Sequence, residues 1–357
     1  MKGVLLSGGT GSRLRPITHT GPKQLVPVAN KPVIEYAIED LKAAGITEIG
    51  VVLGNKGREE IQELLGDGSN YGVDITYIIQ GNPLGLAHAA GCARDFVGDS
   101  DFVMYLGDNM LRHGVSDLIE SFQAGEYGAG IALQEVSNPE AFGVADVDDQ
   151  GTVTELVEKP DDPPSNLALI GMYVFSPAVF DVIDRLEPSW RGELEITDAI
   201  QLLLDEGHAI DSHVVTGWWK DTGKPEDILE ANRLVLEDES LETAGVVEDG
   251  AEVDGRIELH ESAVIEDGAV VRGPVSIAEN TVIKSGTYIG PYTSIGANSE
   301  LKNVHIENSV VIGESTITAS ERIVDSLLGR NANVESAEEF LPEGRRLVVG
   351  ENSQLKL

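Results

Sequence analysis

The chain has 357 residues, 41% of them hydrophobic and 24% charged, so it is long enough for about two domains with packed cores. Its 61 acidic and 25 basic residues give a formal net charge of −36, which excludes nucleic acid and anionic membranes as partners held by long-range attraction. The acidic residues are dispersed along the chain, which favours a protein adapted to high salt, where ions screen its self-repulsion.

No run of 18 apolar residues occurs, and the first apolar run ends at Ser7-Gly8, so the sequence predicts neither a membrane span nor a signal peptide. The single cysteine, Cys92, excludes an intrachain disulfide, and we interpret it as a small core residue. These features predict a cytoplasmic protein.

Up to about residue 235, short apolar runs alternate with amphipathic stretches. Unbroken apolar runs are typical of strands covered on both faces, and helical spacing of apolar residues indicates the helices between them. The alternation predicts an α/β domain, a Rossmann-like layered fold with a mixed, mainly parallel sheet. We expect strands at 3–6, 49–53, 75–79, 102–106 and 153–157, and helices at 32–44, 58–65 and 86–96.

The last third of the chain repeats an apolar residue at every sixth position. The phase slips by one after Leu301, and we expect it to resume at Ile306 and Ile312 and to return at Val324. A six-residue period indicates a parallel β-helix of hexapeptide repeats, whose flat sides stack one aliphatic each inside the coil. We place the domains at 1–240 and 241–357. The repeating residues are Val247, Val253, Leu259, Ile265, Val271, Ile277, Ile283, Ile289, Ile295 and Leu301.

A glycine-rich segment, Leu6-Ser-Gly-Gly-Thr-Gly-Ser-Arg-Leu-Arg-Pro16, follows the first strand directly. Its spacing matches neither the Walker A motif nor the dinucleotide fingerprint. Glycines let backbone N–H groups approach phosphate oxygens closely, and Arg13 would add a forked donor. Taken alone, the segment is equally well interpreted as a tight loop with a solvated arginine. Its candidate nucleotide-binding residues are Leu6, Gly8, Gly9, Thr10, Gly11 and Ser12.

A second segment, Pro22-Lys-Gln-Leu-Val-Pro-Val28, brings Lys23 ten residues after Arg13, where the lysine could return to the same phosphates, and Gln24 beside it is a further candidate nucleotide-binding residue. Together the two segments resemble the signature of the sugar nucleotidylyltransferases. Over its whole length the chain most resembles long-form glucose-1-phosphate thymidylyltransferases, which end in a left-handed β-helix. The resemblance implies an enzyme that joins dTTP or UTP to a hexose 1-phosphate, releases pyrophosphate and uses Mg²⁺.

The resemblance also assigns roles by position. Arg13 would hold the β- and γ-phosphates, and Lys23 would neutralise the α-phosphate in the transition state. Gln80 and the backbone of Gly85 would pair with the edge of a pyrimidine base. Asp108 and Asp221 would hold Mg²⁺, which prefers few carboxylates together with phosphate and water.

For the sugar, the resemblance assigns Glu158 to the hydroxyl groups and Lys159 to the phosphate. Gly143 would contact the sugar beside Phe142, where the family usually has tyrosine. Leu169 and Gly171 would line the pocket. Thr197 lies in another family motif, but it is equally well interpreted as the cap of the helix that follows.

Two alternatives stay open. Many hexapeptide-repeat proteins are acetyltransferases, so the chain could be bifunctional, with His305 a better catalytic candidate than His260, although an exposed repeat residue is the simpler interpretation of either. A non-catalytic regulatory or assembly subunit would have kept the fold without the chemistry, yet none of the motif residues is lost. The flat faces of a β-helix favour a homo-oligomer. The sequence leaves open the choice between dTTP and UTP, and the sugar.

Overall fold

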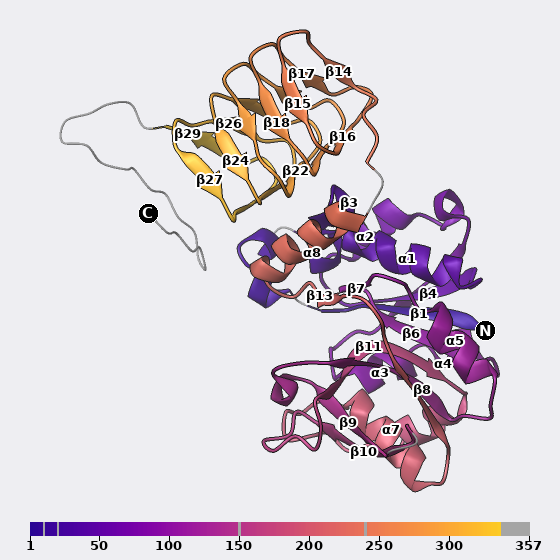
Figure 1. Cartoon of the computed structure of the whole chain (residues 1–357). Helices are drawn as coiled ribbons and strands as arrows, with labels where there is room; N and C mark the ends of the chain where they lie inside the picture. Colours follow the sequence, from indigo (N-terminus) through magenta and orange to yellow (C-terminus); the bar gives the residue numbers. More distant parts are fainter. Residues whose placement is uncertain (10, 20, 149–150, 239–240, 337–357) are drawn as a thin grey trace. The chain divides into compact units, whose positions relative to one another are not determined.

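The computed structural model describes residues 1–9, 11–19, 21–148, 151–238 and 241–336 (Figure 1). These form two compact units, the first made of Met1–Thr10, Gly21–Leu25 and Val33–Asp221, the second of Gly11–Thr20, Val26–Pro32 and Thr222–Leu357. The boundary that we predicted at residue 240 lies outside the described residues, as do residues 337–357. Within the described ranges, no helix is both long and apolar enough to cross a bilayer.

The first unit is built on a nine-stranded mixed sheet with the order β10-β9-β11-β6-β1-β4-β5, in which β8 also pairs with β11, and β12 pairs with β8. Strand β1 lies between β4 and β6 and is parallel to both. Strands β8 and β9 both pair antiparallel with β11. Its strands are β1 (Lys2–Ser7), β4 (Glu48–Leu53), β5 (Asp74–Ile79), β6 (Phe102–Leu106), β8 (Ala129–Glu135), β9 (Gly143–Val147), β10 (Val153–Glu158), β11 (Leu167–Phe175) and β12 (Ile210–Val214), with β7 (Asn109–Leu111) and β13 (Trp219–Asp221) as a separate pair.

Helices cover both faces of this sheet, which explains its unbroken apolar strands. Successive side chains of β1 enter different cores, because a strand alternates its side chains: Leu5 packs under α1, α2 and α5, whereas Val4 and Leu6 pack under α3, α6 and α7. The predicted Rossmann-like fold is therefore confirmed. The helices are α1 (Val33–Ala43), α2 (Arg58–Leu65), α3 (Leu86–Gly91), α4 (Arg94–Val97), α5 (Ser116–Gln123), α6 (Ala178–Ile183) and α7 (Ile196–Asp205), with 3-10 turns η3 (Lys23–Leu25), η4 (Ser69–Tyr71) and η5 (Pro139–Ala141).

The expected helix at 86–96 is interrupted. Helix α3 ends at Gly91, and α4 begins only at Arg94. Glycine has a low helix propensity, so Gly91 is a weak point in this stretch. Cys92 lies at the break and is partly buried.

The second unit contains the predicted β-helix, in which three parallel sheets stack along the coil (Figure 1). One residue of each side points inward: Ile265 pairs with Ile283 and Ile283 with Leu301, each three hexads further on. The strands are β14 (Val246–Val247), β17 (Val264–Ile265), β20 (Val282–Ile283), β23 (Glu300–Lys302), β26 (Thr316–Thr318) and β29 (Asn333–Glu335) in the first sheet; β15 (Glu252–Asp254), β18 (Val270–Arg272), β21 (Tyr288–Ile289), β24 (His305–Glu307) and β27 (Arg322–Val324) in the second; and β16 (Ile257–Leu259), β19 (Val275–Ile277), β22 (Thr293–Ile295), β25 (Val310–Val311) and β28 (Leu327–Leu328) in the third.

The prediction of the phase after Leu301 was partly wrong. Ile306 is fully buried as expected, but Val311 rather than Ile312 is the next aliphatic residue in the core of the coil. Val324 is 41% exposed, and its neighbour Ile323 packs on the core instead. The coil shortens here at the left-handed corners of Asn303 and Asn308, so two successive sides each lose one residue.

One buried asparagine ties three segments of the second unit together. Helix α8 (Pro225–Asp238) carries Asn232, which is fully buried. Its Oδ1 accepts hydrogen bonds from the backbone N of Ala29 and from Ser294 Oγ, and its Nδ2 donates to the carbonyl of Tyr292. Ala29 lies in the turn between β2 (Pro27–Val28) and β3 (Lys31–Pro32). Residues distant in sequence thereby meet on one side chain.

Candidate active site

Lys23 and Asp108 form the centre of the candidate site. Lys23 Nζ makes an ion pair with Asp108 Oδ2, and both side chains are largely buried, with 14% and 10% exposed. A Cβ on Gly9 would lie 2.8 Å from Lys23 Cε, so a side chain at this position would displace the lysine stem. The structure therefore brings Gly9, Lys23 and Asp108 together.

Asp221 reaches the same place through the pairing of β7 with β13. Asp221 is the register partner of Asn109, the residue after Asp108. Asn109 Nδ2 donates to Asp108 Oδ1 at 3.3 Å, and its own Oδ1 accepts from Trp219 Nε1 at 2.7 Å. Asp108 and Asp221 lie at the same end of this strand pair, and carboxylates are the hard oxygen ligands that Mg²⁺ prefers. Within the described ranges, no cluster of three or more His, Cys, Asp or Glu suits a metal.

Gln80 lies at the end of β5 and faces the glycine-rich segment. A Cβ on Gly8 would lie 2.5 Å from Gln80 Oε1, so only glycine allows the amide to lie against this backbone. Gln80 Nε2 donates to the carbonyl of Gly85 at 3.4 Å and lies 3.3 Å from Nδ1 of His88. Gln80 therefore lies against Gly8 and also bonds the backbone of Gly85, the other residue predicted for base recognition.

The loop at Gly85 is held by the segment before α7. Leu84 accepts a backbone hydrogen bond from Leu194 at 2.7 Å, and Ala87 donates one to Leu194 at 3.1 Å. Gly85 has φ +114° and approaches the Leu194 backbone so closely that no Cβ fits. Glycine is required here for both reasons.

Glu158 ends β10 within a network of buried polar groups. Its Oε2 accepts from Thr197 Oγ1 at 2.8 Å, and its Oε1 lies 3.2 Å from Arg191 Nη1. Helix α7 is capped at Glu195, not by the Thr197 side chain, so the capping interpretation of Thr197 was wrong. Because Thr197 binds Glu158 instead, it orients the carboxylate that we predicted for the sugar hydroxyls.

Glu195 is the second carboxylate of this network. It is 4% exposed, accepts from Ser189 Oγ at 2.8 Å and pairs with Arg191 at 3.3 Å. Burial raises the pKa of Glu195 above its usual value, and the nearby Glu158 charge adds to this, while Ser189 and Arg191 oppose it. Arg191 thus shares its charge between two carboxylates.

The remaining predicted sugar residues surround Glu158. A Cβ on Gly143 would lie 3.0 Å from Glu158 Oε2, so Gly143 keeps this edge of the carboxylate open. Lys159 has a left-handed φ of 42° and places its Nζ 3.9 Å from Glu158 Oε1. The Phe142 ring meets Trp219 edge-on, with centroids 5.6 Å apart. Trp219 connects this group to Asn109 and hence to Asp108.

Other residues predicted for the site contribute through their backbone or by packing in the core. Leu6, Gln24 and Leu169 are buried, with 6%, 1% and 5% exposed. Gly171 has φ +83° and interrupts the register of β11 with β8, where a Cβ would collide with Leu106. These residues shape the site without presenting a side chain at its surface.

The rest of the glycine-rich segment belongs to the second unit. Gly11, at φ 63°, begins the 3-10 turn η1 (Ser12–Leu14), and Thr18, in the turn η2 (Ile17–His19), donates to its carbonyl at 2.5 Å. Ser12 and Arg13 are exposed, whereas Leu14 is fully buried and anchors the turn. Thr10 lies outside the described residues. The roles of Arg13 and this turn stay predictions.

Three contact residues of the site were not predicted: Arg191, Thr197 in its contact with Glu158, and His88. Arg191 and Thr197 lie 33 and 39 residues from Glu158 in the sequence. His88 lies 8 residues from Gln80, on the far side of a loop, so neither helical nor strand spacing indicates these contacts. The scarcity of arginine in an acidic chain was the one available signal for Arg191.

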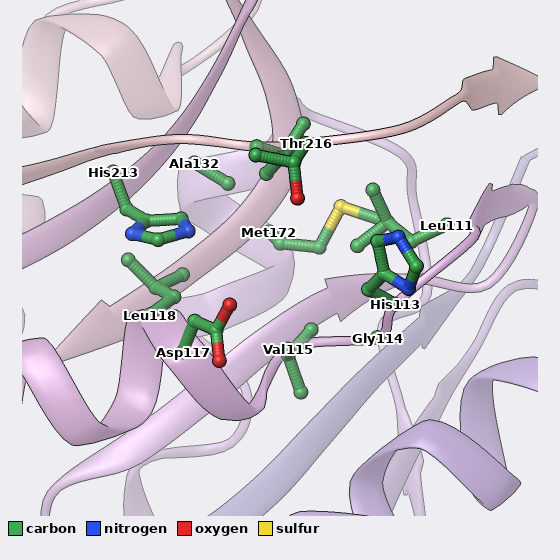
Figure 2. Close-up of a pocket in the computed structure, with 11 residues that line it drawn as sticks. Leu111, His113, Gly114, Val115, Asp117, Leu118, Ala132, Met172, His213 and Thr216 are labelled. Atoms are coloured by element: carbon green, nitrogen blue, oxygen red, sulfur yellow. The ribbon is translucent and has the colours of Figure 1, made fainter.

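A further pocket lies elsewhere in the first unit. Figure 2 shows His113 and His213 on either side of Asp117, beside Met172. None of the predicted substrate residues lines it. In the coil, His305 is exposed against Tyr288, and His260 bonds Ser262 in its own turn, as expected for repeat residues.

Comparison with known proteins identifies the family. Residues 2–238 match the nucleotidyl transferase family, and residues 271–356 match the GMPPB C-terminal domain family. The chain is 81% identical, over the full length of both, to the low-salt glycan biosynthesis nucleotidyltransferase Agl11 of Haloferax volcanii.

It is 48% identical to a glucose-1-phosphate thymidylyltransferase of Streptomyces antibioticus, covering all of this chain and 99% of the relative. Among solved structures, a UDP-glucose pyrophosphorylase complexed with UDP-glucose is 27% identical with a TM-score of 0.60, over 67% of this chain and 99% of its own. The matched motifs and the fold therefore show that this chain belongs to the nucleotidyl transferase family.

Proposed function

We propose that the protein is a sugar-1-phosphate nucleotidylyltransferase that makes dTDP-glucose or UDP-glucose and pyrophosphate from dTTP or UTP and glucose 1-phosphate. The observation that carries the proposal is the ion pair of Lys23 with Asp108 beside Gly9, and the register of Asp221 with Asn109, the residue after Asp108, supports it. The full-length similarity to a glucose-1-phosphate thymidylyltransferase supports the choice of substrates.

The reaction joins two anions, so the protein must cancel their repulsion and align them. In the proposed mechanism, a phosphate oxygen of glucose 1-phosphate attacks the α-phosphorus in line, and the bond to the departing pyrophosphate breaks. Positioning and electrostatic stabilisation supply most of the catalysis in such transfers. Lys23 would leave Asp108 to neutralise the α-phosphate, Arg13 would hold the β- and γ-phosphates, and Lys159 would hold the sugar phosphate.

Asp108 and Asp221 would hold Mg²⁺, which neutralises phosphate charge when bound. With Asp108 engaged as a ligand, Lys23, which pairs with this carboxylate in the structure, would be available to the substrate. Glu158, oriented by Thr197 and Arg191, would accept hydrogen bonds from the sugar hydroxyls beside Gly143.

We also propose that residues 1–240 carry the chemistry, that residues 241–357 mediate assembly into a homo-oligomer, and that the protein works in the cytoplasm at high salt. The net charge of −36 and the similarity to a Haloferax volcanii protein support the salt requirement. A monomeric mass at molar KCl would remove the assembly proposal.

The test is pyrophosphate release with Mg²⁺ in molar KCl, with glucose 1-phosphate paired in turn with dTTP, UTP, CTP, GTP and ATP. Release with dTTP or UTP is expected, and the ratio of their kcat/KM values would name the product. Acetyl-CoA turnover with an amino-sugar phosphate would support the bifunctional alternative. Folded protein that is silent with every nucleotide and sugar phosphate would favour the non-catalytic subunit.

A further inference from the structure

The side-chain amide of Gln80 is held in one orientation by two groups on its nitrogen. The Gly85 carbonyl can only accept, so the atom 3.4 Å from it is the donor Nε2. The same Nε2 lies 3.3 Å from His88 Nδ1, which must therefore accept. His88 on α3 thus carries its proton on Nε2, the ring nitrogen 4.0 Å from Cys92 Sγ, a weak acceptor.

This orientation turns the carbonyl oxygen of Gln80 towards the glycine-rich segment. Oε1 lies where the side chain of residue 8 would begin, and only the glycine leaves room for it. Among the residues that the structure describes, Gln80 Oε1 accepts no hydrogen bond. The amide therefore offers an acceptor, and not a donor, on its open side.

We propose that His88 is a positioning residue that selects the nucleobase through Gln80. The inference rests on the proposed function, in which Gln80 meets the edge of a pyrimidine. Uracil and thymine carry a hydrogen on N3, which Gln80 Oε1 can accept. Cytosine has a lone pair on N3 and would place acceptor against acceptor. A reversed amide would suit cytosine, but it would point its oxygen at the Gly85 carbonyl, which can only accept, and it would require His88 to move its proton from Nε2 to Nδ1.

The preference for UTP over CTP depends on the free-energy difference between two orientations of the Gln80 amide. The hydrogen bond to His88 contributes to that difference and sets the expected effect of losing it. A net hydrogen bond changes such an equilibrium by roughly 3-fold to 10-fold. Loss of the acceptor at residue 88 should therefore lower kcat/KM for UTP, raise it for CTP, and reduce the UTP/CTP ratio by roughly 3-fold to 10-fold.

The experiment measures pyrophosphate release from UTP and CTP with glucose 1-phosphate and Mg²⁺ in molar KCl. His88→Phe keeps a ring but removes both nitrogens, and His88→Ala removes the ring; thermal melts identify whichever variant is folded. Both should show the reduced ratio, whereas His88→Gln, whose amide oxygen can accept from Gln80, should restore it. Cys92→Ala, on the other side of the imidazole, is the matched control and should leave the ratio unchanged.

A double-mutant cycle separates orientation of Gln80 from general damage. In a Gln80→Ala background, His88→Phe should no longer change the ratio. An active wild-type enzyme whose ratio is unaltered by His88→Phe and His88→Ala would overturn this inference alone. The same drop with and without Gln80 would overturn it too. Wild-type protein that releases no pyrophosphate from UTP or dTTP would remove the proposed function and this inference together.

Discussion

The coil of the second unit and the candidate site of the first unit use side chains in opposite ways. Along the coil, Ile265, Ile283 and Leu301 occupy equivalent positions, each fully buried and stacked on the residue one turn away. In the site, no two side chains have equivalent surroundings: Lys23 pairs with a carboxylate, Gln80 lies against a glycine, and Glu158 is held by a threonine and an arginine.

This difference separates stability from activity. Each coil position contributes nearly the same apolar burial, so a substitution there should change the free energy of unfolding and leave the chemistry intact. A site residue contributes a charge or an orientation that matters in the transition state, so its loss should change kcat with a smaller effect on folding.

The largest expected effect tests the site side of the comparison. Lys23→Ala should lower kcat by at least ~10²-fold, comparable to the loss of one transition-state donor. Lys302→Ala, at an exposed position of the coil, is the matched control and should leave kcat unchanged. Steady-state kinetics with the preferred nucleotide measures both, and a Lys23→Ala enzyme with nearly wild-type kcat would contradict the assignment.

Asn232 on α8 tests a buried polar residue of the second unit, where it bonds to the coil. Asn232→Ala leaves the Ala29 amide, the Tyr292 carbonyl and the Ser294 hydroxyl without this partner, and we expect a loss of about 2–4 kcal/mol of unfolding free energy. Asn70→Ala, at an exposed turn, should cost less than about 0.5 kcal/mol. Urea denaturation in molar KCl measures both; equal midpoints would show that the buried bonds contribute nothing net.

A smaller effect is expected for one inward-facing aliphatic. Val271 is fully buried in the coil, and Val271→Ala should cost about 2 kcal/mol through lost burial and the cavity left behind. Val324→Ala makes the same chemical change at a side chain that is 41% exposed, and it should cost under about 0.5 kcal/mol. Below the melting temperature, kcat should be unchanged in both. A fall in kcat for folded Val271→Ala would break the separation of stability from activity.

The smallest effect concerns Cys92, in the first unit but outside the proposed chemistry. Burial raises the pKa of the Cys92 thiol, so less thiolate is present at pH 8 than in a free cysteine. Because the thiolate is the reacting form, alkylation by iodoacetamide should be roughly 10-fold slower in the folded protein than in urea. Equal rates would indicate an exposed, reactive cysteine and would reopen a chemical role for it.

Patterns that repeat at a short period were predictable from the sequence. The apolar runs gave the strands of the mixed sheet and the hexads gave the coil, because both depend on which face of a local segment is buried. The motifs also singled out Gly9, Lys23 and Asp108, which lie together in the structure, while their roles stay predictions.

Contacts between distant segments were decided only by the tertiary structure. The corners at Asn303 and Asn308 moved the inward position from Ile312 to Val311, because a side of the coil that is one residue shorter shifts which residue faces the core. Thr197 binds Glu158 rather than capping its own helix, and His88 orients Gln80 across a loop. A hydrogen bond between side chains depends on distances of a few ångströms across the fold, and the local sequence carries no measure of these.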